Sequence, residues 1–152
     1  MPSYYDYLLT QADQQGNLND FLSISDGRLF FAELDPLALA TQHGSPLEVS
    51  FCPQITRRVQ EMQALFAQAS RQVGYQSQFV YAYATKANFA EQVIRTAITA
   101  GAHYETSSPF DVRIAHKLYR SGVLPADRFV FCNGSKEPAY ILSLIHISEP
   151  TR

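Results

Sequence analysis

The second half of the sequence alternates short apolar runs with longer segments in which apolar residues recur every three or four positions. A short continuous run is typical of a strand covered on both faces, and a period near 3.6 is typical of a helix with one buried face. The apolar runs predict strands over 79–84, 103–106 and 128–132. The helical periodicity predicts helices over 55–69, 89–98 and 112–119.

The first fifty residues follow a less regular pattern. Apolar residues at helical spacing predict a helix over 5–12, and a second, brief helix is expected over 37–42. The turn signal Ser25-Asp26-Gly27 precedes an apolar run that predicts a strand over 29–32. Apolar and polar residues alternate over 47–51, which predicts one more, half-buried strand.

Glycine, serine and asparagine residues mark the expected ends of the helices. Gly74, Gly101 and Gly122 follow the three periodic segments, where a glycine commonly ends a helix. Ser108 followed by a proline predicts a helix start. Asn88 is expected to cap the helix that follows it, with the acidic Glu91 three positions on.

Strands that alternate with helices favour an α/β fold with a parallel sheet and right-handed crossovers. Successive strands are spaced by about 25 to 30 residues, which is the unit size of a (β/α)8 barrel. A doubly wound sheet fits the same periodicity, so the pattern alone leaves both architectures open.

Composition narrows the class of protein further. Hydrophobic residues make up 46% of the 152 residues and charged residues 17%, which is typical of a folded soluble domain. The net charge of −2 favours neither nucleic acid nor an acidic membrane surface as a partner. The sequence has no signal-peptide pattern and no membrane-length apolar run, and we predict no metal site. We therefore expect a cytoplasmic protein, with Cys52 and Cys132 as free thiols.

Lys86 is the residue with the clearest chemical potential. It follows the predicted strand 79–84 directly, so in a parallel α/β fold it lies at the carboxyl end of a strand, where active sites collect. A lysine amine on such a rigid base suits covalent bonding to the aldehyde of a cofactor.

The residues around Lys86 resemble a known signature. Tyr81-Ala82-Tyr83-Ala84-Thr85-Lys86-Ala87-Asn88 is similar to the Tyr-Ala-x-Lys-x-Asn motif of the barrel-type, pyridoxal-phosphate-dependent decarboxylases of ornithine, arginine and diaminopimelate. Three further segments resemble the same family: Gly44-Ser45-Pro46-Leu47-Glu48-Val49, Ala100-Gly101-Ala102-His103-Tyr104-Glu105-Thr106-Ser107-Ser108 and Cys132-Asn133-Gly134-Ser135-Lys136-Glu137. The resemblance extends over roughly 27–141 and implies pyridoxal 5'-phosphate as the cofactor, held by Lys86.

Details of the motifs bear on the substrate. Glu105 stands where many family members have aspartate, and this glutamate and the Cys-Asn-Gly segment resemble the arginine-decarboxylase version. The resemblance thus implies decarboxylation of a basic amino acid, first of all arginine to agmatine in polyamine biosynthesis. Diaminopimelate or ornithine decarboxylase is the alternative, and a non-catalytic regulatory relative that pairs with an active partner is a third. Alanine racemases rank lower, because their lysine motif continues with Tyr-Gly-His, whereas Phe89-Ala90-Glu91 follows here.

The resemblance also implies roles for individual residues. Lys86 is expected to be the catalytic and cofactor-binding lysine, with Ala84 beside the cofactor ring on the same strand face. Glu105 is expected near the lysine amine, where its charge influences the protonation of that amine. The partners implied are a small amino-acid substrate and a second copy of the chain in a homodimer.

Three segments are expected along the chain. Residues 1–26 are an N-terminal extension, and 27–141 form the N-terminal part of a pyridoxal-phosphate-binding (β/α)8 TIM barrel, including a strand that enters from a β domain. Residues 142–152 resemble the translation of a sequencing-library transposon adapter and are expected to be an artefact. About three of the eight barrel strands are visible, so we expect the printed chain by itself to lack decarboxylase activity.

Overall fold

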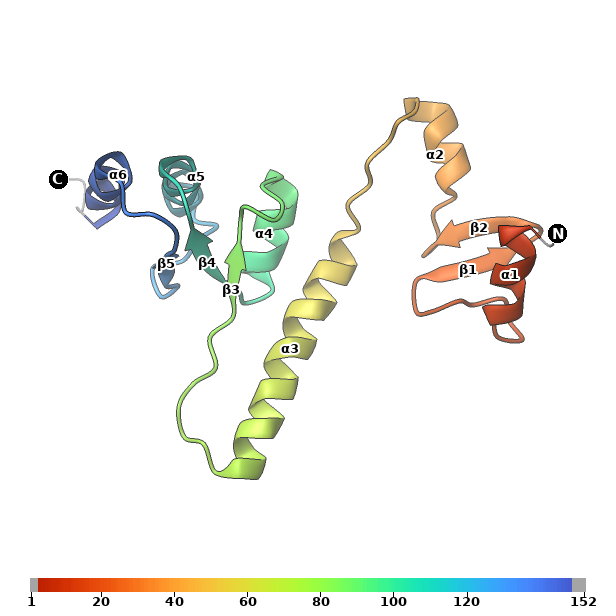
Figure 1. Ribbon diagram of the computed structural model, residues 1–152, viewed down its shortest axis with the longest axis horizontal. Helices are drawn as coiled ribbons and strands as arrows, with labels where there is room; N and C mark the ends of the chain where they lie inside the picture. Colours follow the sequence, from red (N-terminus) through yellow and green to blue (C-terminus); the bar gives the residue numbers. More distant parts are fainter. Residues whose placement is uncertain (1–2, 149–152) are drawn as a thin grey trace. The chain divides into compact units, whose positions relative to one another are not determined.

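The computed structural model describes residues 3–148 and divides into two compact units, Met1–Val49 and Ser50–Arg152 (Figure 1). None of the described helices is long and apolar enough to cross a membrane. Each unit is described separately below.

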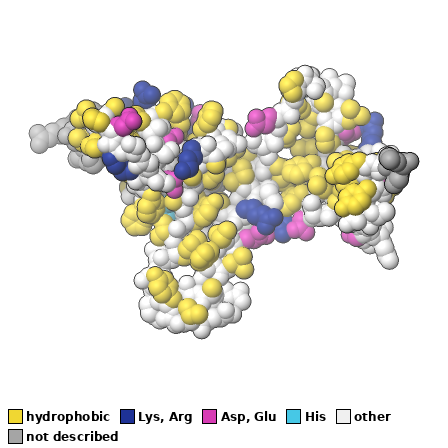
Figure 2. Space-filling view, viewed as in Figure 1, with side chains coloured by type: hydrophobic (Ala, Val, Ile, Leu, Met, Phe, Trp, Pro, Cys, Tyr) yellow, Lys and Arg dark blue, Asp and Glu magenta, His cyan; other side chains and the backbone are white. Residues whose placement is uncertain are grey.

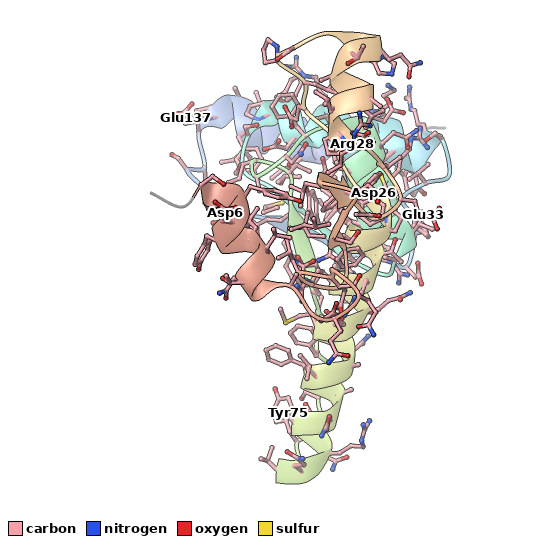
Figure 3. The ribbon with its side chains drawn as sticks, turned by 90° about the vertical axis from the view of Figure 1, so that its right-hand side faces the viewer. Asp6, Asp26, Arg28, Glu33, Tyr75 and Glu137 are labelled. Atoms are coloured by element: carbon pink, nitrogen blue, oxygen red, sulfur yellow. The ribbon has the colours of Figure 1, made fainter. Side chains whose placement is uncertain are left out.

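The first unit is a β-hairpin with two short helices. Helix α1 (Tyr4–Gln11) precedes the antiparallel strands β1 (Leu22–Ser25) and β2 (Arg28–Phe31), and helix α2 (Pro36–His43) follows. Asp26 and Gly27 join the strands with positive φ angles of 49° and 73°, the backbone that tight hairpin turns require. Arg28, which Figure 3 labels with Asp26, forms an ion pair of 2.7 Å with Asp35, the N-cap residue of α2.

The second unit is a three-stranded parallel sheet in the order β3-β4-β5, with helices between successive strands (Figure 1). Its elements are α3 (Cys52–Val73), β3 (Ala82–Ala84), α4 (Glu91–Thr99), β4 (His103–Thr106), α5 (Pro109–Arg120), β5 (Val130–Cys132) and α6 (Pro138–Ser148). This β-α-β-α-β order is the one predicted from the hydrophobic pattern, and the α/β class is confirmed.

The main core of this unit lies between the sheet and helices α4 and α5. Its buried residues are Ile94, Ile98, Tyr104, Ala115, Leu118 and Leu124. Complete burial of an aliphatic side chain such as Ile94 contributes about 1.5–3 kcal/mol to folding. These contacts fix β4 firmly against the two helices, and β4 carries one of the candidate site residues.

The N-terminal half and the middle of helix α3 pack against α4 and the loop that follows it. Val59 is buried with Ala97 and Ala102, and the side-chain amide of Gln63 donates a 3.1 Å hydrogen bond to the Gly101 carbonyl. The C-terminal half exposes apolar side chains, which Figure 2 shows as yellow atoms over the end of the helix. Tyr75, labelled in Figure 3, follows this end and is 61% exposed.

Several sequence predictions are wrong in detail. Residues 47–51 form no strand, because alternation defines two faces but supplies no partner for the backbone hydrogen bonds. Conversely, β1 was not predicted; its four residues alternate apolar and polar, and the turn at Asp26 brings the segment against β2. Strand β3 is shorter than the predicted 79–84. Asn88 does not cap α4, whose N-cap is Ala90, and instead accepts a 2.9 Å hydrogen bond from the Ala90 N–H.

The boundaries of the expected segments stay predictions. The division between the compact units falls after Val49, and helix α6 continues from the family-like region into the proposed adapter segment as far as Ser148. Residues 149–152 lie outside the described residues. A helical conformation does not test the origin of this segment, because helix formation depends on the residues present and not on where they came from.

Candidate active site

Lys86 is the second residue after the end of the parallel strand β3. A turn at this point is closed by a 3.1 Å hydrogen bond from the Ala87 N–H to the Ala84 carbonyl. The Lys86 side chain is 59% exposed. Its amine is thus accessible while its backbone is attached to the sheet.

Glu105 faces Lys86 from the neighbouring strand. In the register between β3 and β4, Ala84 is opposite Glu105, so both lie on one face of the sheet. Lys86 Nζ is 3.9 Å from Glu105 Oε1, an ion pair too long for a direct hydrogen bond. The sheet therefore brings together the two charged residues that the family resemblance singles out, with Ala84 adjacent to both.

Asn133, just after β5, holds the Glu105 carboxylate from the other side. Its side-chain amide donates a 3.1 Å hydrogen bond to Glu105 Oε1, the oxygen that is nearest to Lys86. Its own side-chain oxygen accepts a 2.7 Å bond from the Gly134 N–H, which fixes the amide orientation. Lys86, Glu105 and Asn133 come from the carboxyl ends of three successive strands, as expected of an α/β active site.

Beneath this surface, Thr85 and Asp111 form a buried polar contact. The Thr85 hydroxyl is 1% exposed and donates to Asp111 Oδ1 over 2.9 Å. It also lies 3.3 Å from the Glu105 carbonyl oxygen. Asp111 belongs to the first turn of α5, so the contact joins the end of β3 to a helix 26 residues later in the chain.

Asp111 is ionised in its buried position. Burial by itself raises the pKa of this carboxyl group, but hydrogen bonds from Ser107, Ser108 and Thr85 outweigh it and hold the pKa below its ordinary value of 3.8. The carboxylate therefore keeps its charge at neutral pH, with only 6% of the residue exposed.

The sheet face beside Lys86 is open. A hollow of about 370 Å³ is lined by Val80, Ala82, Glu105, Phe131, Cys132 and Asn133. Ala82 contributes a small side chain to this lining. Among residues 3–148, no group of three or more His, Cys, Asp or Glu side chains could hold a metal ion.

Sequence reasoning found part of this arrangement. Lys86, Ala84 and Glu105 are brought together, but their roles toward a cofactor stay predictions. Asn133 was named only within the Cys132-Asn133-Gly134 motif, and Thr85 and Asp111 were not given a role. One signal was present for Asp111, which is three residues after Ser108, the spacing of a helix N-terminal cap.

Comparisons with known proteins give one solved structure that is similar to this chain. It is the crystal structure of diaminopimelate decarboxylase from M. jannaschi, with a TM-score of 0.65 and 29% sequence identity. The match covers 82% of this chain and 27% of that chain, so this chain spans about a quarter of the length of its structural neighbour. No family model and no curated protein matches the sequence. The match supports the resemblance to the pyridoxal-phosphate-dependent decarboxylases and is not specific for arginine.

Proposed function

We propose that the protein uses pyridoxal 5'-phosphate, held by Lys86, to remove the α-carboxylate of a basic amino acid. The observation that carries this proposal is the accessible Lys86 amine at the end of a parallel strand, 3.9 Å from Glu105. The similarity to a decarboxylase structure over 82% of the chain supports the same conclusion.

The residues present fit this cofactor at its aldehyde end. Lys86 Nζ would bond to the aldehyde carbon with loss of water, and Ala84 would lie beside the ring. Glu105 offers a negative charge that attracts the lysine in its protonated form, while Asn133 keeps the carboxylate pointed toward the amine. When bound, pyridoxal phosphate supplies an electron sink for the electron pair that decarboxylation leaves on the substrate.

The reaction assigns successive tasks to Lys86. Its amine would hold the cofactor before the substrate binds and would yield that place to the substrate amine. After carbon dioxide has left and a proton has replaced it on Cα, the Lys86 amine would take its place again and so release the amine product. Glu105 and Asn133 position the Lys86 amine for these exchanges.

We propose two candidate substrates, in order of preference. The Glu105 and Cys132-Asn133-Gly134 motifs resemble arginine decarboxylases, so arginine is the first candidate. Diaminopimelate is the second, because the solved structure that matches is a diaminopimelate decarboxylase. A homodimer and a cytoplasmic location stay predictions.

Release of labelled carbon dioxide tests the proposal. Because the printed chain by itself is expected to be inactive, a longer parent protein that contains it is purified and incubated with pyridoxal phosphate and with carboxyl-labelled arginine, diaminopimelate or ornithine in separate reactions. We expect one of these to be turned over, and we expect Lys86→Arg to abolish turnover while Lys117→Arg, on the exposed surface of α5, does not. Turnover that persists in Lys86→Arg contradicts the proposal. Cofactor binding without turnover of any substrate favours the non-catalytic relative.

A further inference from the structure

We propose that Asp111 is a positioning residue for Lys86 and acts through the hydroxyl of Thr85. This inference rests on the proposed function of Lys86 and adds two residues to it. Neither residue touches the hollow, and both are buried beneath it.

The two carboxylate oxygens of Asp111 accept hydrogen bonds with different structural roles. Its Oδ2 atom accepts bonds from the Ser107 N–H at 2.9 Å, the Ser107 hydroxyl at 3.1 Å and the Ser108 hydroxyl at 2.9 Å. The Ser108 hydroxyl in turn accepts from the Asp111 N–H and caps α5. The Oδ1 atom takes no part in this cap and accepts a hydrogen bond from the hydroxyl of Thr85, in the turn after β3.

Thr85 is therefore anchored to a group that is itself fixed. Four donors surround the Asp111 carboxylate, and hydrogen bonds to an ionised acceptor are about twice as strong as neutral ones. A negative charge in the first turn of α5 is also favoured by the helix dipole. The anchor thus resists displacement more than a neutral contact would.

The anchor acts on Lys86 through the turn that follows β3, because Thr85 and Lys86 are adjacent residues of this turn. The Thr85 side chain holds the start of the turn in the interior, while the Lys86 side chain is 59% exposed and the Ala87 N–H closes the turn on the Ala84 carbonyl. The Thr85 hydroxyl also lies 3.3 Å from the Glu105 carbonyl oxygen. Thr85 therefore also helps to hold the backbone of Glu105, the ion-pair partner of Lys86, in place. Reacting groups displaced by about 1 Å can lose a hundredfold in rate.

Thr85→Val tests this role, because valine keeps the shape of threonine and lacks the hydroxyl. Tyr140→Phe is the matched control: it also removes a buried hydroxyl, one that lies 2.6 Å from the Thr106 hydroxyl and donates to the Thr106 carbonyl over 3.0 Å. Thr85→Ser restores the hydroxyl and should restore the wild-type behaviour.

Two readouts are measured on each variant. The first is the hydrogen-exchange rate of the Ala87 amide, which needs no cofactor. The second is the amount of pyridoxal phosphate fixed by borohydride on Lys86 relative to Lys117, measured by peptide mass mapping. For Thr85→Val we expect Ala87 exchange to rise about tenfold, the equivalent of one hydrogen bond to a charged group, and the Lys86 preference to fall. Tyr140→Phe and Thr85→Ser should leave both readouts near the wild-type values.

The outcomes separate this inference from the proposed function. Unchanged Ala87 exchange and an unchanged Lys86 preference in Thr85→Val overturn the positioning role and leave the function of Lys86 intact. Equal effects in Tyr140→Phe overturn it too, because they show a general loss of stability. A wild-type protein without any preference for Lys86 refutes the proposed function itself.

Discussion

Replacement of Asp111 by asparagine should destabilise the second unit by about 2 kcal/mol at neutral pH. Asparagine keeps the size of the side chain but has an NH2 group, which cannot accept a hydrogen bond, in place of one carboxylate oxygen. If the NH2 group takes the place of Oδ2, the Ser107 N–H loses its acceptor. If it takes the place of Oδ1, the Thr85 hydroxyl must donate to the Glu105 carbonyl instead, 3.3 Å away.

The pH dependence of this effect makes the prediction specific. Because folding lowers the pKa of Asp111 below 3.8, its ionised form stabilises the folded state. This contribution is complete above the ordinary pKa and is lost as the pH falls through the lower pKa of the folded state. The difference in unfolding free energy between wild type and Asp111→Asn, called the gap below, should therefore be constant near neutral pH and disappear only in acid below pH 3.8.

Urea unfolding followed by circular dichroism measures this gap across a pH series. Other carboxylates titrate in both proteins, so their contributions cancel in the difference. Glu33→Gln, at a residue for which the structure gives no ion pair or hydrogen bond, is the control, and we expect it to leave stability within about 0.5 kcal/mol of wild type. A gap for Asp111→Asn that is below about 0.5 kcal/mol at neutral pH, or that stays open in strong acid, refutes the buried anchor.

Three further predictions test other parts of the account. Ile94→Ala, at a fully buried position, should cost about 2–5 kcal/mol in urea unfolding; a cost below 1 kcal/mol would contradict the packed core. Gly134→Ala should cost about 1–3 kcal/mol, since its φ is +81° and a Cβ atom would lie 3.0 Å from the Ser107 carbonyl oxygen; an unchanged melting temperature would rule this out. Glu105→Gln should change stability by less than about 1 kcal/mol, because the long ion pair involves an exposed lysine, yet slow cofactor fixation on Lys86; the reverse pattern would show a purely structural role.

Local sequence patterns predict the elements from α3 to β5 well, because both the periodicity and the end signals lie within each element, but helix α6 was not predicted. Strand β4 matches its predicted range, and α5 begins after Ser108 as expected. The hairpin partner β1 was missed because pairing across the turn at Asp26, rather than its own apolar content, holds it in place. The segment 47–51 was overpredicted for the opposite reason: it has the pattern of a strand without a partner.

Part of the candidate site was likewise predicted from the sequence and part was not. Lys86 was found because it follows a strand, and Glu105 because its segment resembles the decarboxylase family; parallel strands bring the two positions together. The bond between Thr85 and Asp111 depends on how α5 is placed against β3, and no local pattern contains a contact between residues 26 positions apart. Asn133 likewise reaches Glu105 only through the register of β4 and β5.

The most direct test of the central claim is to map where pyridoxal phosphate bonds to the wild-type protein. The sequence has three lysines, Lys86, Lys117 and Lys136, which serve as internal references for one another. Lys117 is 71% exposed and Lys86 59%, so unspecific reaction should favour Lys117. After borohydride fixation at limiting cofactor, we predict that peptide mass mapping finds most of the label on Lys86. Label that follows exposure, with Lys117 at or above Lys86, would contradict the account.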